Sequence, residues 1–205
     1  MIDQQPVARA GLRQWIQELT QSVELYESGS ADDAMVLLER EPIDAVILDL
    51  DLARHDGIEL IKRFRRHDER LAILVFTSSP EHRFGVRALR AGAIGYVSKG
   101  SSKRIVGLAV QRTLEGKHFM SRELSEILAQ QITGGEVLNG YDSLSDREHQ
   151  IVSMIVRGLT ASQIASELSL SVKTVHTHRA RALKKLKLKN NAELTHYAFR
   201  SGLAD

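Results

Sequence analysis

The chain has 205 residues, a formal net charge of +2 and no cysteine. Its length suits two domains, and the lack of cysteine excludes disulfides, thiolate metal sites and thiol catalysis. No stretch approaches the roughly 18 apolar residues of a membrane-spanning helix, and the N-terminus lacks the pattern of a signal peptide. We therefore expect a cytoplasmic protein with no membrane partner.

Charge is distributed unevenly along the chain. Residues 1–140 hold 18 Lys and Arg against 20 Asp and Glu, whereas residues 141–205 hold 10 against 6. The first part is therefore slightly acidic and the second part basic. This difference fits a regulatory module joined to a module that binds a polyanion, although many globular domains differ by as much.

In chain order, the first part alternates amphipathic helices with short apolar runs. The predicted helices are residues 7–19, 31–39, 58–66, 81–91 and 103–114, and the predicted strands are residues 22–26, 45–48, 71–76 and 94–97. Buried strands that alternate with helices favour a parallel sheet covered on both faces. In such sheets, functional side chains gather where the strands end.

Beyond residue 116 the pattern changes. Residues 121–131 could form one more helix, and residues 132–139, which include Gly134 and Gly135, are typical of a flexible linker. The basic part then shows clear helix signals: two capping boxes, a glycine stop and further cap residues predict four short helices that make an all-α module. The residues are Ser145 with Glu148, Thr160 with Gln163, Gly158, Ser171, and Asn190 or Asn191 at the start of a last helix through residue 201.

Polar side chains follow three of the predicted strands. Asp49 ends the run 45–48, Thr77 ends the next run, and Lys99 follows the third. A carboxylate, a hydroxyl and an ammonium at adjacent strand ends suit the acceptance of a phosphoryl group, with the carboxylate attacking phosphorus. Mg²⁺ would need further oxygen ligands, for which Asp3 is the available candidate. The plain alternative is that these residues simply end strands as polar loop residues.

Two segments resemble the receiver domain of response regulators. One is residues 44–57, DAVILDLDLARHDG, and the other is residues 89–99, LRAGAIGYVSK. The resemblance implies a flavodoxin-like, doubly wound parallel sheet in which Asp49 is phosphorylated by a sensor histidine kinase. It also implies a conserved hydroxyl at Thr77, a switch aromatic at Tyr96, the lysine Lys99, and Mg²⁺ held by Asp3, Asp49 and the backbone carbonyl of Asp51.

The N-terminus departs from the receiver pattern. Receivers carry an acidic pair there, but this chain reads Asp3-Gln4-Gln5-Pro6, so that a neutral amide replaces one carboxylate. Only two residues precede Asp3, and we therefore expect the first, central strand to be missing or truncated. Both features weaken the expected Mg²⁺ site and keep open a pseudo-receiver that is controlled by dimerisation or another ligand.

The basic part predicts a helix-turn-helix, with residues 160–168 as its first helix and residues 172–187 as its recognition helix. An apolar row, Val172, Val175, Leu183 and Leu186, runs along the second helix. We expect Lys173, His176 and Thr177 to reach base edges. The expected phosphate contacts are Arg179, Arg181, Lys185 and Lys189, and Lys184 is expected on the outer, DNA-binding face of the same helix. Hydroxyls and amides at Thr160, Ser171 and Thr174 can also hold phosphate. The alternative is a solvated basic helix; a metal site at His176 and His178 fails, because residues two apart on a helix diverge.

Residues 143–203 resemble the LuxR-type helix-turn-helix of the NarL/FixJ response regulators. The resemblance is carried by residues 144–148, LSDRE, residues 158–160, GLT, residues 171–178, SVKTVHTH, and residues 192–194, AEL. It implies binding to double-stranded DNA as a homodimer, with residues 191–201 often forming the dimer contact.

We therefore predict a transcriptional regulator with three parts: a receiver-like domain over residues 1–116, a linker with a possible helix over 117–142, and a DNA-binding domain over 143–205. Phosphorylation of Asp49 is expected to control DNA binding. The protein is not expected to be an enzyme; a small α/β hydrolase or phosphatase is the rival from another class, but the chain has no G-x-S-x-G elbow, P-loop or dinucleotide fingerprint.

Overall fold

The computed structural model describes residues 1–20, 22–52, 55–132, 143–168 and 170–200. The chain divides into two compact units, Met1–Thr133 and Gly134–Asp205, and each is described by itself. Among the described residues, no helix is long and apolar enough to cross a membrane.

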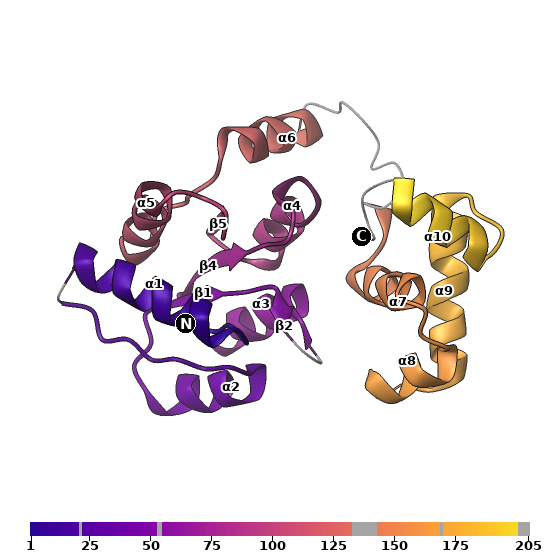
Figure 1. The fold of residues 1–205 in the computed structure, drawn as a ribbon, viewed down its shortest axis with the longest axis horizontal. Helices are drawn as coiled ribbons and strands as arrows, with labels where there is room; N and C mark the ends of the chain where they lie inside the picture. Colours follow the sequence, from indigo (N-terminus) through magenta and orange to yellow (C-terminus); the bar gives the residue numbers. More distant parts are fainter. Residues whose placement is uncertain (21, 53–54, 133–142, 169, 201–205) are drawn as a thin grey trace. The chain divides into compact units, whose positions relative to one another are not determined.

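A parallel sheet forms the centre of the first unit (Figure 1). Its strands are β1 (Ala45–Leu48), β4 (Ala72–Thr77) and β5 (Gly95–Ser98), in the order β1-β4-β5. The register pairs Leu48 with Val75 and Thr77 with Ser98, which brings the carboxyl ends of the strands to one edge. Every residue of β4 is buried, as expected for the middle of a sheet with two covered faces.

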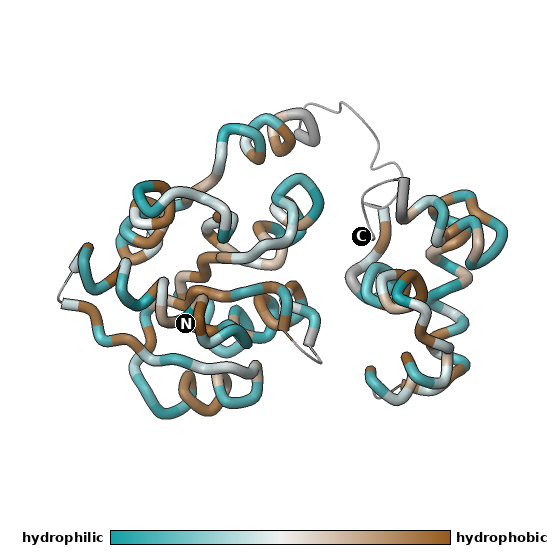
Figure 2. Tube along the Cα trace, in the orientation of Figure 1, coloured by the Kyte–Doolittle hydropathy of each residue, from teal (hydrophilic) through white to brown (hydrophobic). Residues whose placement is uncertain are grey.

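Helices cover both faces of this sheet. On one face α1 (Pro6–Leu19) and α5 (Lys103–Leu114) pack Ile16 and Val110 against Phe76. On the other face lie α2 (Ala31–Arg40), α3 (Gly57–His67) and α4 (Glu81–Ala91), with Phe64 at the centre of the larger core cluster. Figure 2 shows the strands as largely hydrophobic, while the helices alternate between hydrophobic and hydrophilic turns. The predicted α/β doubly wound fold is therefore confirmed.

The N-terminal residues occupy the place of the first strand only in part. Ile2 forms parallel bridges with Leu48 on one side and with Ser28 on the other. Its amide donates to the Ile47 carbonyl at 2.8 Å, and its carbonyl accepts from the Asp49 amide at 2.9 Å. The expected gap is thus partly filled by residues 1–3, and the first strand is short rather than absent.

The other predicted elements of the first unit form with small shifts at their ends, apart from one strand. Residues 22–26 lack the hydrogen bonding of a regular strand, because their neighbour is only three residues long. Two short strands were not predicted. They are β2 (Asp51–Leu52) and β3 (His55–Asp56), which pair with each other in antiparallel orientation. The additional helix forms as α6 (Arg122–Ile132), and it packs on α4. The rest of the predicted linker, residues 133–139, lies outside the described residues.

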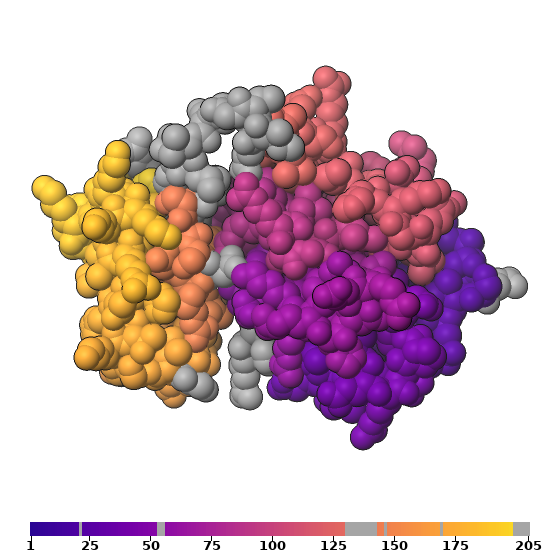
Figure 3. Space-filling view, turned by 180° about the vertical axis from the view of Figure 1, so that it is seen from behind, coloured from indigo at the N-terminus to yellow at the C-terminus, as the bar shows by residue number. Residues whose placement is uncertain are grey.

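The second unit is helical: α7 (Asp146–Val156), α8 (Ala161–Glu167), α9 (Val172–Leu186) and α10 (Asn191–Arg200). These helices appear in orange to yellow in the space-filling view of Figure 3. Both predicted capping boxes form, at Ser145 with Glu148 and at Thr160 with Gln163. Gly158 has a φ of 89°, the left-handed conformation predicted for a helix stop.

Two apolar clusters hold α9 in place. Val175 packs with Ile151, Met154 and Ile164 in one cluster, while Leu183 and Leu186 pack with α7 and α10 residues in the other. The other member of the predicted apolar row, Val172, lies outside these clusters. Val172 is 40% exposed, because it occupies the first position of α9, before the helix reaches the core.

Candidate phosphoryl-acceptor pocket and nucleic-acid interface

Side chains from three strand ends and the N-terminus meet at one edge of the sheet. Asp49 follows β1, Thr77 ends β4, and Lys99 follows β5. The Lys99 ammonium lies 2.7 Å from a carboxylate oxygen of Asp49 and 2.7 Å from one of Asp3. The Lys99 amide also donates to the Thr77 carbonyl at 2.9 Å, which fixes the loop after β5 against β4. The structure thus brings the side chains of Asp3, Asp49 and Lys99 together and places Thr77 at the neighbouring strand end.

Burial strengthens the interactions between the charged side chains of this cluster, because little water screens them. Asp49 is 2% exposed, Asp3 is 5% exposed and Thr77 is fully buried. Burial of the Lys99 ammonium acts to lower its pKa, but the hydrogen bonds and charges of Asp3 and Asp49 outweigh it and raise the pKa of Lys99 above its usual value. Lys99 therefore carries a positive charge beside the two carboxylates at neutral pH.

Local backbone contacts set the position of Asp3. The Gln5 amide donates to one Asp3 carboxylate oxygen at 2.8 Å, which leaves the other oxygen for Lys99. The Arg9 guanidinium donates to the Asp3 carbonyl at 2.6 Å, so the first turn of α1 holds the short first strand in place. Gln4, where the receiver pattern has a second acid, is an exposed side chain.

The loop after Asp49 is held close to α3. The Asp51 amide donates to the second carboxylate oxygen of Asp49 at 3.2 Å. A Cβ atom on Gly57 would lie 2.6 Å from the Leu50 Cα, so only glycine permits this approach. Asp56 caps α3 by accepting from the Ile58 amide at 2.8 Å, which places its carboxylate at the helix rather than beside Asp49.

Tyr96 lies on β5 behind this edge. Its side chain is fully buried, and its hydroxyl donates to the Ser79 carbonyl at 2.8 Å, in the loop that follows Thr77. Burial, and then the nearby charges of Glu81 and Asp49, raise the pKa of the Tyr96 hydroxyl, so it stays protonated and remains a donor. The predicted switch aromatic is thus hydrogen-bonded to the loop that follows the predicted hydroxyl, Thr77.

The oxygen ligands expected here, two carboxylates and one backbone carbonyl, suit Mg²⁺ better than a metal whose ligands must all come from the protein. Among the described residues, no group of three His, Cys, Asp or Glu side chains could hold a metal ion. Two buried carboxylates, Asp3 and Asp49, do lie together around Lys99. Mg²⁺ binds through one or two carboxylates and keeps several waters, so these residues with the Asp51 carbonyl fit it.

The second unit presents α9 with a polar outer face. Lys173, His176, Thr177, Arg181 and Lys184 are all exposed, and they recur at helical spacing opposite the buried row. Ser171 caps α9 by accepting from the Thr174 amide at 3.0 Å. The capped start of α9 and its exposed basic side chains therefore lie on one helix, the arrangement expected of a helix that enters the major groove.

Two predicted phosphate contacts are engaged inside the unit. The Lys185 ammonium lies 2.7 Å from Glu148 and donates to the Ser143 carbonyl at 3.0 Å. The Arg179 guanidinium donates to the Asn191 side chain on α10. Burial opposes ionisation of Glu148, but hydrogen bonds from Lys185 and Ser145 lower the pKa of that carboxyl below its ordinary value. These contacts join α9 to α7 and α10.

Comparison with known proteins decides the family. A family model described as "Response regulator receiver domain" matches residues 1–110, more than half of the chain. The chain belongs to the response-regulator family. A second model, "Bacterial regulatory proteins, luxR family", matches residues 142–198, so this response regulator carries the predicted combination of a receiver domain and a LuxR-type helix-turn-helix. That combination confirms the predicted NarL/FixJ type.

Similar proteins align along almost the whole chain. "Response regulator UvrY" of Escherichia coli (strain K12) is 29% identical over 206 residues, which cover 100% of this chain and 94% of UvrY. "Transcriptional activator protein ExaE" of Pseudomonas putida is 31% identical over 205 residues, with 99% and 96% covered. A solved structure of RcsB from Salmonella enterica serovar Typhimurium, bound to promoter rprA in the presence of the phosphomimetic BeF3⁻, is 25% identical with a TM-score of 0.72. That match covers 96% of this chain and 95% of RcsB.

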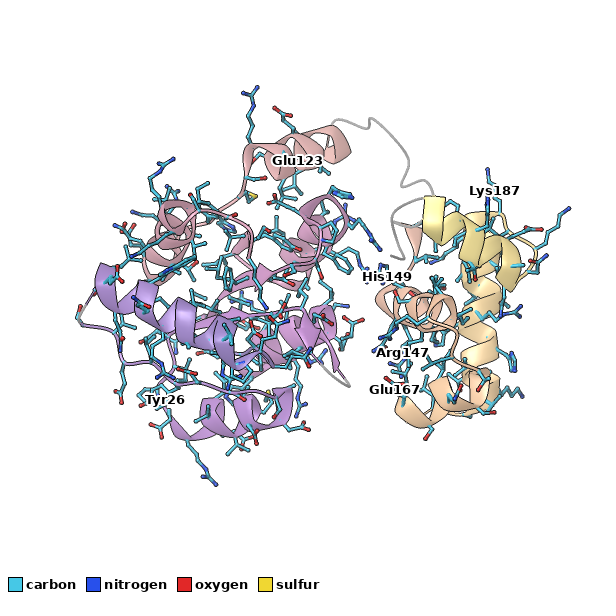
Figure 4. All side chains as sticks on the ribbon, viewed as in Figure 1. Tyr26, Glu123, Arg147, His149, Glu167 and Lys187 are labelled. Atoms are coloured by element: carbon cyan, nitrogen blue, oxygen red, sulfur yellow. The ribbon has the colours of Figure 1, made fainter. Side chains whose placement is uncertain are left out.

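Sequence reasoning missed two contributors to the site of this response regulator. The Gln5 amide orients Asp3, and a Gln-Pro step after an acidic residue gives no signal of that. The Lys185–Glu148 pair joins residues 37 positions apart, and only the buried capping-box position of Glu148 indicates that it needs a cation. The predicted recognition helix ends one residue early: α9 stops at Leu186, and Lys187, labelled in Figure 4, follows it in the left-handed conformation.

Proposed function

We propose that this protein is a DNA-binding transcriptional regulator whose activity is controlled by phosphorylation of Asp49 by a sensor histidine kinase. The observation that carries the proposal is the convergence of Asp49, Asp3, Thr77 and Lys99 at one sheet edge. It is supported by the capped basic helix α9 of the second unit, whose outer face is exposed.

In the proposed phosphorylation, a carboxylate oxygen of Asp49 attacks the phosphorus of a phosphohistidine. The new O–P bond forms as the P–N bond breaks, and the departing imidazole nitrogen takes up a proton. Mg²⁺, when bound by Asp3, Asp49 and the Asp51 carbonyl, would neutralise charge on the phosphoryl oxygens. Lys99 then exchanges its carboxylate partner for a phosphoryl oxygen, because its ammonium already touches Asp49.

Thr77 and Tyr96 would report this change to the rest of the receiver. The Thr77 hydroxyl can donate to a phosphoryl oxygen if it moves toward Asp49. Tyr96 is bonded to the Ser79 carbonyl two residues beyond Thr77, so a shift of that loop must break or move this hydrogen bond. The start of α4 follows the same loop at Glu81. The signal therefore reaches α4 through a path of adjacent residues.

The proposed DNA contacts divide by their position on α9. Lys173, His176 and Thr177 lie in the first half of the helix and are proposed to reach base edges. Arg181, Lys184 and Lys189 are exposed and suit phosphates, to which Thr160, Ser171 and Thr174 add hydroxyls or amides at helix starts. Lys185 and Arg179 contribute charge, but their side chains already hold α9 in place.

Dimer formation on DNA is part of the proposal. The RcsB neighbour was solved on promoter DNA, and another solved structure contains two RcsB dimers bound to two parallel DNAs. For this chain, α10 (Asn191–Arg200) is the proposed contact between copies. Two recognition helices then bind half-sites about one helical turn apart.

The test combines mass and DNA binding. Incubation of the full chain with a small phosphoryl donor and Mg²⁺ should add one phosphoryl group in the intact mass, and this gain should disappear in Asp49→Asn. Asp51→Asn is the matched control, because only the backbone carbonyl of Asp51 is assigned to the metal. The phosphorylated chain should bind promoter DNA at least ten times more tightly than the unmodified chain.

A pseudo-receiver remains the second candidate, because the exposed Gln4 stands where the receiver pattern has a metal-binding acid. No mass gain in the wild-type chain, together with unchanged DNA binding in Asp49→Asn, would favour this candidate and contradict phosphorylation control.

A further inference from the structure

An arginine in the first turn of α7 reaches across to the turn of the helix-turn-helix. Arg147 is the second residue of α7, and one terminal nitrogen of its guanidinium donates to the Leu168 carbonyl at 3.2 Å. The two residues are 21 positions apart in the chain. Figure 4 labels Arg147 and also Glu167, the last residue of α8, which precedes Leu168. The contact therefore joins the start of α7 to the end of α8.

The Leu168 carbonyl lies at the C-terminal end of α8. Leu168 is the C-cap of that helix, and the last carbonyls of a helix have no hydrogen-bond donor within it. The Leu170 amide donates to the Ala165 carbonyl at 2.8 Å, and Arg147 supplies the donor for Leu168. Because the C-terminal end of a helix carries partial negative charge, a cation is favourable there. Arg147 is thus a cap that a different helix supplies.

A second contact fixes the direction of the guanidinium. Its other terminal nitrogen donates to the Gln150 side-chain oxygen at 2.6 Å, about one turn further along α7. A guanidinium is planar and its donors have fixed directions, so two acceptors bound at once determine its position. A lysine has one nitrogen on a flexible stem and does not reproduce this geometry. Arg147 is half-buried with both terminal nitrogens bonded inside the unit, which separates it from the exposed cations of α9.

The next residue of α7 holds the other end of α9. Glu148 is buried and pairs with Lys185 at 2.7 Å, close to the last residue of α9. Arg147 holds the turn that leads to Ser171, the cap at the start of α9. An apolar cluster fills the space between α7, α8 and α9, but apolar packing has no preferred direction, whereas hydrogen bonds do. Two consecutive residues of α7 therefore set the direction of α9 from both of its ends.

We infer that Arg147 is a positioning residue for sequence recognition: by holding the Leu168 carbonyl, it sets the angle at which the first half of α9 meets base edges. This inference rests on the proposed DNA binding. The groups of a binding site must be held within about 0.5 Å of the productive geometry. Phosphate contacts tolerate more, because attraction between charges falls off gradually with distance and carries no sequence information. Loss of Arg147 should therefore lower specificity more than overall affinity.

The test measures a ratio of two affinities. The wild-type full chain, incubated with a phosphoryl donor and Mg²⁺, selects a preferred duplex from a randomised pool, and a scrambled duplex of the same composition is the reference. Arg147→Met should lower the ratio of the two affinities at least tenfold, while binding to the scrambled duplex changes less than threefold. Arg147→Lys keeps the charge but not the two directed contacts, so it should lower the ratio at least fivefold.

Arg157→Met is the matched control. Arg157 is exposed and follows the other end of α7, so this change removes one positive charge and should leave the ratio within twofold. Gln150→Leu removes the second acceptor of the guanidinium and should lower the ratio about threefold. If the Arg147 variants do not fold, Gln150→Leu decides, and an unchanged ratio in that variant contradicts the inference.

Three further results would overturn it. An unchanged ratio in Arg147→Lys would mean that only the charge matters, and an equal loss of affinity for both duplexes would make Arg147 a phosphate contact. An equal fall of the ratio in Arg157→Met would attribute the effect to net charge. If selection yields no preferred duplex, the proposed sequence recognition itself fails, and the inference fails with it.

Discussion

Lys99 holds two buried carboxylates together, because its ammonium lies 2.7 Å from both Asp3 and Asp49. Lys99→Met removes that charge and leaves the carboxylates facing each other, so it should lower the free energy of unfolding by ~3 kcal/mol. Mg²⁺ should restore much of this loss, because the cation replaces the ammonium. Urea unfolding at pH 7 with and without Mg²⁺ measures both effects.

The control for this variant is Lys103→Met. Lys103 pairs with Glu18 on the surface, where both side chains are nearly half exposed. An exposed pair contributes at most about 1 kcal/mol, and Mg²⁺ has no reason to compensate for its loss. Equal destabilisation of the two variants, without Mg²⁺ rescue of Lys99→Met, would contradict the role given to Lys99.

The Met1 ammonium makes folding depend on pH in a chain that begins at Met1. Burial lowers its pKa from 8.0 to about 6, with Glu27 opposing and Arg9 adding to the shift. The unfolded chain therefore binds more protons between pH 6 and 8, and stability should rise across that window by roughly 2–3 kcal/mol. Urea unfolding from pH 5.5 to 8.5 measures the rise.

N-terminal acetylation is the control, since it removes the ammonium and should flatten this part of the curve. Burial, and then the charge of Arg181, lower the pKa of His178, and acetylation of Met1 does not alter that group. The difference between the two curves therefore isolates Met1. Identical pH profiles for the acetylated and free chains would show that the amine is not buried in solution.

At the scale of the element, the linker helix α6 is part of the receiver unit. Leu124 of α6 is fully buried, and a Cβ on Gly85 of α4 would lie 2.7 Å from its side chain. Leu124→Ala should therefore cost about 3 kcal/mol and speed amide hydrogen exchange across α6. Leu114→Ala, at a site 44% exposed, is the control and should cost less than about 1 kcal/mol.

A double variant shows whether α6 and α4 are coupled. Gly85→Ala alone should be destabilising, because the methyl group meets Leu124. Combined with Leu124→Ala, which creates the missing space, it should cost less than the sum of the two single variants. Additive costs would mean that the two helices do not pack closely in solution.

Local signals in the sequence predicted most elements, whereas contacts between distant residues were harder to infer. The capping boxes at Ser145 and Thr160 each involve only four consecutive residues, so whether they form depends little on the rest of the fold. Asp49 and Lys99 were brought together correctly, because parallel strands end at one edge. The Leu124–Gly85 contact and the partial first strand depend on packing geometry, which no local pattern encodes.

For the molecule as a whole, one unit carries the proposed phosphoryl acceptor and the other carries the proposed DNA-binding surface. The charge asymmetry of the sequence follows this division, since the helix-turn-helix part carries the basic excess. Apolar contacts and the Lys185–Glu148 pair hold α9 in place independently of DNA. Its exposed cations are therefore available for binding, and the two groups of cations can be distinguished by experiment.

Neighbouring lysines on α9 should separate DNA affinity from stability. Lys184 is exposed, so Lys184→Met should weaken binding to duplex DNA and reduce the salt dependence of the affinity by about one ion, with unfolding unchanged. Lys185→Met leaves the buried Glu148 without its cation and should lower the free energy of unfolding by about 1–2 kcal/mol. Its effect on the salt dependence should be smaller. Titrations of the phosphorylated full chain from 50 to 200 mM salt, with urea unfolding of the same variants, measure both properties. A larger loss of salt dependence in Lys185→Met than in Lys184→Met would place Lys185 on the phosphates and contradict its assignment as a contact within the unit.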